Sequence, residues 1–244
     1  MKAMGRPVTQ SVPAFRRLAA LATLDLQSDR LLAEAAMHSR SLQPGRELLT
    51  EGAPVPGPTL ILSGWAARAR LLADGRRQIM SLILPGDLIG NCRQNLPLAV
   101  SSVVALGHLT LCPAPAITEA LKQAHAVSHA LDEAYLLAQI TRLGRLSAEE
   151  RLIDLMLEVR DRLALCGLVT DNAFAWPLTQ SALADVLGLT PVHVNRTLQQ
   201  LRGSGDVILR AGRVQLMDPS GLATRVGHVT ARVTSDTEAA RHDR

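Results

Sequence analysis

The chain has 244 residues, of which 47% are hydrophobic and 20% are charged. This is a globular composition, long enough for two modest domains that each bury a core, and it excludes a disordered chain. Aromatic residues make up only 2%, which disfavours a protein that stacks single-stranded bases on aromatic side chains. The net charge of +4 comes almost wholly from arginine, because Lys2 and Lys122 are the only lysines. Arginine suits phosphate and guanine contacts, but a GC-rich coding bias has the same effect, so charge alone does not identify a partner.

The chain contains 3 cysteines, Cys92, Cys112 and Cys166, which are widely spaced and form no CxxC pair. We therefore expect neither a disulfide framework nor a metal site built from cysteines alone. No apolar run reaches the roughly 18 residues that a membrane-spanning helix needs. The N-terminal residues also lack the apolar core of a signal peptide. The sequence predicts a cytoplasmic protein with no membrane partner.

The N-terminal part begins with short helices. Residues 1–14 have no hydrophobic period, and we expect them to form a loose arm. Apolar residues three or four apart predict short helices between Phe15 and about His38. Ser28 is placed to be the N-cap of the second helix.

From Leu42 onward, Gly and Pro recur every few residues between short apolar or alternating runs. Short strands separated by turn signals at this spacing are typical of a small β-sandwich or barrel. Asp74-Gly75, between two such runs, predicts a hairpin turn. The expected strands are residues 59–62, 67–71, 78–84 and a final pair within 101–112 that is split near Gly107.

The pattern turns helical after Pro115. We expect a short helix around residues 117–121 and a longer helix over about 126–145, with apolar residues three or four apart. Ser147 and Glu150 form a capping box that begins a further helix, which ends near Gly167. The expected parts are an N-terminal domain (1–125), a helical connector (126–166), a C-terminal domain (167–222) and a flexible tail (223–244).

The segment after Trp176 carries the functional signal. Thr179 is placed to cap a short helix, and Gly188 permits the left-handed backbone that turns the chain sharply. Thr190 is placed to cap a second helix, with Pro191 at the first helical position, where a missing N–H costs nothing. Two helices joined in this way indicate a helix-turn-helix.

The second of these helices has an apolar face, with Val194, Leu198 and Leu201, and a polar face. A slim helix with a polar face fits the major groove of DNA, where an arginine can bind guanine through two acceptors. Two short runs around Ala211-Gly212 predict a β-wing. The polar residues of the second helix are His193, Asn195, Arg196, Gln199 and Gln200.

A simpler interpretation of these helices does not involve DNA binding. Any two short amphipathic helices joined by glycine have this pattern, and Arg196 would then form a surface ion pair, for instance with Asp185. The wing, the two N-caps and the small Ala184 at the expected helix contact favour DNA binding.

The chain resembles the CRP/FNR superfamily of transcription regulators over about residues 15–222. The strongest motif is Leu-Thr-Gln-Ser-Ala-Leu-Ala-Asp-Val-Leu-Gly-Leu-Thr-Pro-Val-His-Val-Asn-Arg-Thr-Leu. Three earlier motifs resemble the β-roll of that family's sensor domain: Leu-Ser-Gly-Trp-Ala (62–66), Asp-Gly-Arg-Arg-Gln-Ile (74–79) and Pro-Gly-Asp-Leu-Ile-Gly (85–90). The resemblance implies an α+β fold with an N-terminal β-roll (jelly-roll-like) sensor domain, a long dimerisation helix and a C-terminal winged helix-turn-helix.

The resemblance also implies a homodimer that binds a palindromic operator in double-stranded DNA, and a contact with RNA polymerase if the protein is an activator. Arg196 matches the family's base-reading arginine, whereas Thr179 and Gln180 match positions that contact the DNA backbone. The family often has Glu where Val192 stands, and His193 and Asn195 are also distinctive, so we expect an operator unlike the best-known ones. The remaining expected DNA-binding residues are Ser181, Thr190 and Gln199, and the expected dimerisation residues are Val127, Leu131, Ala134 and Ala138.

The sensor end departs from the cyclic-nucleotide binders of the family. Those proteins carry a Gly-Glu pair for the ribose and an Arg-Ser or Arg-Thr pair for the phosphate, but no Gly-Glu follows Asp87 here, and Ser101-Ser102 stands where the arginine pair belongs. The cyclic phosphate would lack a bidentate partner unless Arg93 replaced it. We therefore expect a degenerate effector pocket, formed by Asp87, Arg93, Ser101 and Ser102, that does not bind cyclic AMP.

No cofactor is predicted, and the effector is left open. An iron–sulfur cluster is disfavoured because residues 1–41 contain no cysteine. Four alternatives stay open: a cyclic-nucleotide-responsive regulator in which Arg93 replaces the missing arginine, a haem-responsive one that uses a histidine or cysteine, a thiol-responsive one that uses Cys92 beside Arg93, and a regulator that needs no effector.

Two other classes of function fit the sequence less well. An enzyme is disfavoured because the sequence has no nucleophile elbow, P-loop, GxGxxG or HExxH motif. A ligand-binding module without DNA contact is disfavoured by the wing and by the polar face of the second helix.

Overall fold

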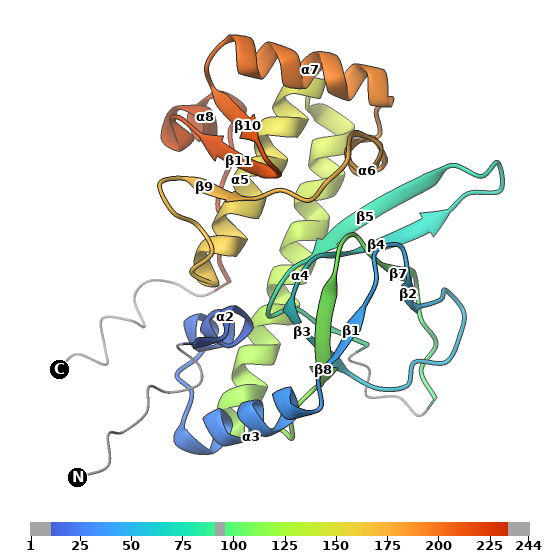
Figure 1. The fold of residues 1–244 in the computed structure, drawn as a ribbon, viewed down its shortest axis with the longest axis vertical. Helices are drawn as coiled ribbons and strands as arrows, with labels where there is room; N and C mark the ends of the chain where they lie inside the picture. The colour runs from blue at the N-terminus through green and yellow to red at the C-terminus, as the bar shows by residue number, and fades with distance from the viewer. Residues whose placement is uncertain (1–10, 91–95, 234–244) are drawn as a thin grey trace.

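The structure of the protein, a computed structural model, describes residues 11–90 and 96–233. A β-rich N-terminal part and a smaller C-terminal part lie against two long helices, α4 and α5, which run through the molecule (Figure 1). No helix among these residues is long and apolar enough to cross a membrane.

Two short helices precede the strands: α2 (Pro13–Leu21) and α3 (Leu26–Met37). The helices are where the sequence predicts them, but the cap is not. Asp25 is the N-cap of α3, and its carboxylate accepts a hydrogen bond from the Ser28 N–H at 2.7 Å. Ser28 lies inside the first turn, where its hydroxyl is buried against the Thr118 hydroxyl, 2.6 Å away.

The strands form two antiparallel four-stranded sheets with the orders β1-β8-β3-β6 and β2-β7-β4-β5, which confirms the expected β-roll. The Asp74-Gly75 turn joins β4 to β5, with Gly75 at a φ of +84°. Three strands have only two or three residues each, too few for a readable alternation, and the sequence does not predict them. The strands are β1 (Arg40–Leu42), β2 (Glu47–Leu49), β3 (Thr59–Ser63), β4 (Ala66–Leu71), β5 (Arg77–Ile83), β6 (Leu88–Ile89), β7 (Ser102–Ala105) and β8 (Leu109–Pro113).

The long helix α4 (Glu119–Arg145) is continuous over 27 residues. The separate short helix expected around 117–121 does not form, because Thr118 caps α4 and the helix continues without a break. The boundary expected between residues 125 and 126 therefore falls inside α4. Helix α5 (Ala148–Leu165) begins with the predicted capping box of Ser147 and Glu150.

The C-terminal part holds three helices and a three-stranded sheet of order β10-β11-β9. Strand β9 and helix α8 are not predicted from the sequence, and α8 spans the boundary expected at residue 222. After α8, His228 bonds Asp154 and Asp161 of α5, so the described part of the expected tail is docked. The elements are β9 (Ala173–Ala175), α6 (Gln180–Leu187), α7 (Pro191–Gly203), β10 (Val207–Arg210), β11 (Arg213–Leu216) and α8 (Pro219–Val226).

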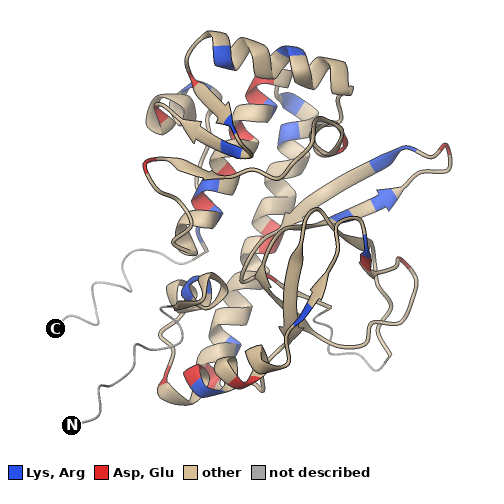
Figure 2. Cartoon of the chain, in the orientation of Figure 1, with Lys and Arg blue, Asp and Glu red and all other residues tan. Residues whose placement is uncertain are grey.

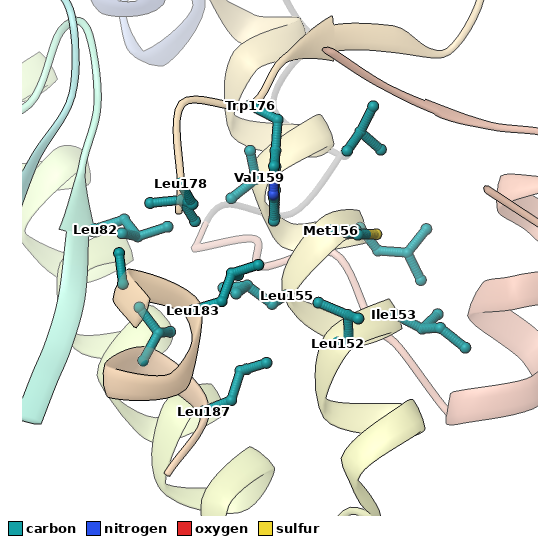
Figure 3. Packing of buried hydrophobic residues seen from close by; sticks show 14 of the residues in the cluster. Leu82, Leu152, Ile153, Leu155, Met156, Val159, Trp176, Leu178, Leu183 and Leu187 are labelled. Carbon is teal, nitrogen blue, oxygen red and sulfur yellow. The ribbon is translucent and has the colours of Figure 1, made fainter. Parts of the chain in front are cut away.

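One hydrophobic core connects the two parts. Buried side chains of α5, α6 and the β4–β5 sheet form one cluster, with Leu82 of β5 on the same side of α5 as Leu183 and Leu187 of α6 (Figure 3). Trp65 of the β-roll meets Trp176, just before α6, edge to face with ring centroids 6.0 Å apart. The C-terminal part therefore packs directly against the β-roll and is not connected to it by the chain alone.

A buried ion network runs beside this core. Asp87 pairs with Arg17 of α2 at 3.0 Å and with Arg162 of α5 at 2.7 Å. Glu158 pairs with both Arg162 and Arg142 of α4. These charged groups are buried away from water and are stabilised by one another. Removing one of them would leave its partners buried without an opposite charge.

The network continues to the segment after α8. Arg142 also bonds Asp154, which in turn bonds His228. Although burial lowers it, the hydrogen bonds to Asp154 and Asp161 raise the pKa of His228 to about 9. The imidazole therefore carries a positive charge at neutral pH and holds the C-terminal segment on α5.

Candidate DNA-binding site

The turn between α6 and α7 is built by local hydrogen bonds. The Thr179 hydroxyl accepts from the Ala182 N–H at 3.1 Å, and the Thr190 hydroxyl accepts from the His193 N–H at 3.2 Å. Gly188 ends α6 with a φ of +64°, a conformation that residues with a Cβ atom rarely adopt. The caps and the turn residue thus occur where the sequence predicts them.

Helix α7 packs its apolar face inward and leaves its polar face open. Val194, Leu198 and Leu201 are buried, together with Thr197, whose hydroxyl bonds the His193 carbonyl oxygen. Arg196 and Gln199 are exposed, whereas His193 and Asn195 are half-buried. The inward and outward faces are those that the hydrophobic spacing predicts.

Most of the candidate DNA-binding residues meet on one surface. An open hollow lies between the start of α6 and the outer face of α7, and Thr179, Ser181 and Thr190 are exposed at the two helix N-termini. Backbone N–H groups and the helix dipoles make such N-termini favourable for phosphate oxygens. The hollow is lined by Gln180, Pro191, Val192, Asn195, Arg196 and Gln199.

Arg196 does not form an ion pair with Asp185, the partner that the simpler interpretation gives as an example. The Asp185 carboxylate instead receives two hydrogen bonds from Arg77, at 2.9 and 2.7 Å. Within residues 11–90 and 96–233, no acceptor bonds the Arg196 guanidinium. The group is therefore available to a ligand outside the chain.

The wing adds two basic residues that are not among the expected DNA-binding residues. Strands β10 and β11 are joined at Ala211 and Gly212, both with positive φ, as in a two-residue hairpin. Arg210 and Arg213 flank this turn and are exposed. Figure 2 shows basic positions on α7 and at the wing. Arginines beside a predicted wing turn are a signal that the sequence already contains.

The residues expected in the effector pocket do not form one open site. Asp87 is buried in the ion network and also accepts from the Leu84 N–H at 2.7 Å. Ser101 is buried, and the Ser102 hydroxyl accepts from the Glu51 N–H at 3.1 Å. Arg93, like Cys92, lies outside the described residues. Asp87 thus has a structural role, because long-range partners occupy both carboxylate oxygens.

A small cavity does remain between the β4–β5 sheet and α4. Its volume is about 20 Å³, and its lining includes Arg68, Asp132 and Arg162. A cavity of this size holds about one water molecule. Burial, with the nearby Asp87 carboxylate, raises the pKa of Asp132 to about 6.

The two described cysteines have the features of packing residues. Both are buried, and burial raises the pKa of Cys112 to about 11 and that of Cys166 to about 12. Because the thiolate is the reactive form, these thiols are unreactive near neutral pH. Among the residues that the structure describes, no group of three His, Cys, Asp or Glu side chains is arranged to hold a metal ion.

The exposed stripe of α4 differs from the predicted dimerisation face. Leu131 is 4% exposed, so it packs inside its own protomer, and Val127, Ala134 and Ala138 lie on one flank, partly exposed. The outermost apolar side chains are Leu137 (58% exposed) and Ile140 (67%). They share a stripe at alternating four- and three-residue spacing that consists of Ala126, Ala130, Glu133, Leu137, Ile140 and Gly144.

A β-roll joined by long helices to a winged helix-turn-helix with a free polar face defines a DNA-binding transcription regulator. Comparison with known families agrees with this class. Residues 39–123 match the cyclic nucleotide-binding domain, and residues 150–225 match the Crp-like helix-turn-helix domain. The chain belongs to the CRP/FNR family of transcription regulators.

Individual relatives support the same assignment. The nitrogen fixation regulation protein FixK of Bradyrhizobium diazoefficiens is 30% identical over 66% of this chain and 70% of its own length. The transcriptional activatory protein AadR of Rhodopseudomonas palustris is 30% identical over 84% of this chain and 88% of its own length. The structure of FixK2 from Bradyrhizobium japonicum has the same fold, with a TM-score of 0.65 and 24% identity over 80% of this chain and 98% of that one.

Proposed function

We propose that this regulator binds a palindromic operator as a homodimer, with one α7 helix in the major groove of each half-site. The observation that carries the proposal is the unpaired polar face of α7, centred on the free Arg196 guanidinium and flanked by two exposed helix N-termini. Arg196, Asn195, His193, Val192 and Gln199 face the bases in this arrangement, whereas Thr179, Gln180, Ser181 and Thr190 contact the phosphates.

Selection of bound sites from random DNA tests this proposal directly. We expect a two-fold symmetric motif whose half-sites lie about one DNA turn apart, bound with an affinity that falls steeply as salt increases. Binding with no sequence preference, or to an asymmetric single site, would contradict it.

The proposed dimer forms through the exposed stripe of α4 rather than through Leu131. Leu137 and Ile140 provide the apolar contact, while Ala126, Ala130 and Gly144 are small enough for two helices to approach closely. Stripes with this alternating spacing pair as coiled coils. Val127, Ala134 and Ala138 would then lie at the edge of the interface.

The variant Ile140→Glu should dissociate the dimer. It places two like charges near the two-fold axis while leaving the protomer core intact, because Ile140 is exposed. We expect a monomer in analytical ultracentrifugation at micromolar concentration, with unchanged helical content and much weaker binding to the palindrome. Met37→Glu is the matched control, since Met37 is 76% exposed but is the last residue of α3 and not part of α4. A dimeric Ile140→Glu protein would place the interface elsewhere.

We also propose that the β-roll does not bind cyclic AMP. The cavity between the β-roll and α4 holds only about one water molecule, and Asp87 is committed to Arg17 and Arg162. Isothermal titration calorimetry with cyclic AMP should therefore show no saturable heat, and the ligand should leave DNA affinity unchanged. Stoichiometric binding that alters DNA affinity would refute this.

The names of the relatives support a role as an activator, since several are called transcriptional activators. We propose that this chain likewise activates transcription, with RNA polymerase as a partner. Transcription in vitro from a promoter carrying the selected site should rise when the protein is added, and a fall would identify a repressor.

A further inference from the structure

The C-terminal end of α6 is held by side chains from outside the helix-turn-helix. A helix leaves its last carbonyl groups without intrahelical partners. Here the Asp185 carbonyl accepts from the Gln78 side chain at 2.8 Å, the Val186 carbonyl from Gln139 at 2.6 Å and the Leu187 carbonyl from Arg151 at 2.9 Å. The donors come from β5, α4 and α5, so three different elements fix one end of α6.

An ion pair strengthens the contact from β5. The Arg77 guanidinium donates two hydrogen bonds to one carboxylate oxygen of Asp185, from Nε at 2.9 Å and from a terminal nitrogen at 2.7 Å. The two side chains are 37% and 22% exposed, so water screens the pair only in part. The positive charge also lies at the end of α6 where the helix dipole is negative.

The contact connects the β-roll to α7 through hydrogen-bonded strands and packed helices. Arg77 and Gln78 belong to β5 and pair with Leu71 and Arg70 of β4, on the turn side of a register shift between Arg68 and Ala69. On the other side, α6 packs directly against α7. A displacement of the β4–β5 hairpin would therefore carry α6 and α7 with it.

We propose that Arg77 and Gln78 are positioning residues for DNA binding, which set the orientation of the helix-turn-helix relative to α4. We call the contacts of Arg77 and Gln78 with Asp185 the clamp. Because α4 carries the proposed dimer interface, the clamp fixes the separation of the two α7 helices. The inference rests on the proposed function as a dimer on a palindrome. The clamp then selects the half-site spacing and makes no contact with DNA itself.

Three DNA fragments test the clamp: the selected palindrome, the same palindrome with one base pair inserted between the half-sites, and a single half-site. Arg77→Ala should bind the palindrome about tenfold more weakly than the unmodified protein, a decrease equivalent to one charge-assisted hydrogen bond. Its affinity for the single half-site should not change. Its preference for the correct spacing should shrink, because the two α7 helices are no longer held at one separation.

Two further variants make the result specific. Arg76→Ala removes the same charge from the adjacent residue, but Arg76 pairs with Asp74 in its own turn, so binding to all three fragments should match that of the unmodified protein. Asp185→Asn should reproduce the weaker binding seen with Arg77→Ala, because it breaks the clamp from the other side. The double variant Arg77→Asp with Asp185→Arg restores the opposite charges and should recover part of the spacing preference.

The outcomes that would contradict the proposed role of Arg77 and Gln78 can be told apart. Tighter palindrome binding by Arg77→Ala would show that the contact inhibits DNA binding. An equal decrease in affinity for all three fragments, together with tighter binding by Asp185→Asn, would show that Arg77 touches phosphates. If the unmodified protein showed no preference for the palindrome over a half-site, the proposed dimeric function would fail first, before any variant was compared.

Discussion

Replacing Arg196 by alanine should weaken operator binding by about 1–3 kcal/mol per half-site and relax the preference for guanine at one symmetric position. The guanidinium is exposed on α7, within the hollow shared with the start of α6, and Asp185 is unavailable to it because it pairs with Arg77. An arginine in this position can bind two acceptors on a guanine edge. The change applies to both half-sites of a palindrome, so the total effect is large.

Site selection with the variant, alongside affinity measurements at constant salt, checks this expectation. Gln180→Ala is the informative comparison, because the proposed partner of this side chain at the start of α6 is a phosphate, and its removal should weaken binding to all sequences alike. Arg202→Ala, near the end of α7, controls for the removal of positive charge. An Arg196→Ala protein with an unchanged motif and affinity would remove this residue from base recognition.

The second large effect concerns stability. Replacing Asp87 by alanine should lower the free energy of unfolding by about 3–5 kcal/mol, because it leaves two buried cations without their shared partner. Arg17 and Arg162 are only 1% and 2% exposed, so neither can turn to water without unpacking α2 or α5 from the β-roll. Urea denaturation followed by circular dichroism measures the decrease.

A matched variant shows whether the loss of stability comes from burial of the ion pair or from removing any ion pair. Asp74→Ala also removes a carboxylate from an arginine, but the two side chains of that pair are 52% and 78% exposed, so water screens the pair and its loss should leave the free energy of unfolding almost unchanged. Asp87→Asn keeps the size of the side chain and should fall between the two. Equal, small decreases for both alanine variants would mean that the buried network does not hold the β-roll to α5.

Asp87 has a different role from the one that its motif predicts. Its place in a family motif predicts a residue that lines an effector pocket. The structure instead joins it to residues 70 and 75 positions away along the chain, and its carboxylate links three elements. A change in this network would displace α5, and therefore also the helix-turn-helix, because α6 and α7 pack against α5.

The sequence by itself determined those features that depend on neighbouring residues. The capping threonines of α6 and α7, the capping box of α5 and the turn at Gly188 were all predictable, because each hydrogen bond or φ angle involves residues within about one turn of each other. The polar and apolar faces of α7 followed for the same reason, since helical periodicity sorts them.

Tertiary structure decided everything that depends on which surfaces meet. Leu131 and Leu137 are both leucines on α4 and equally suited to an interface, but the β-roll and α5 cover one side of the helix and leave the other open. Similarly, the sequence suggested Arg196 as a partner for Asp185, and only the approach of β5 to α6 made Arg77 the arginine that it binds. Burial and ion pairing across distant segments are set by packing, which local periodicity does not encode.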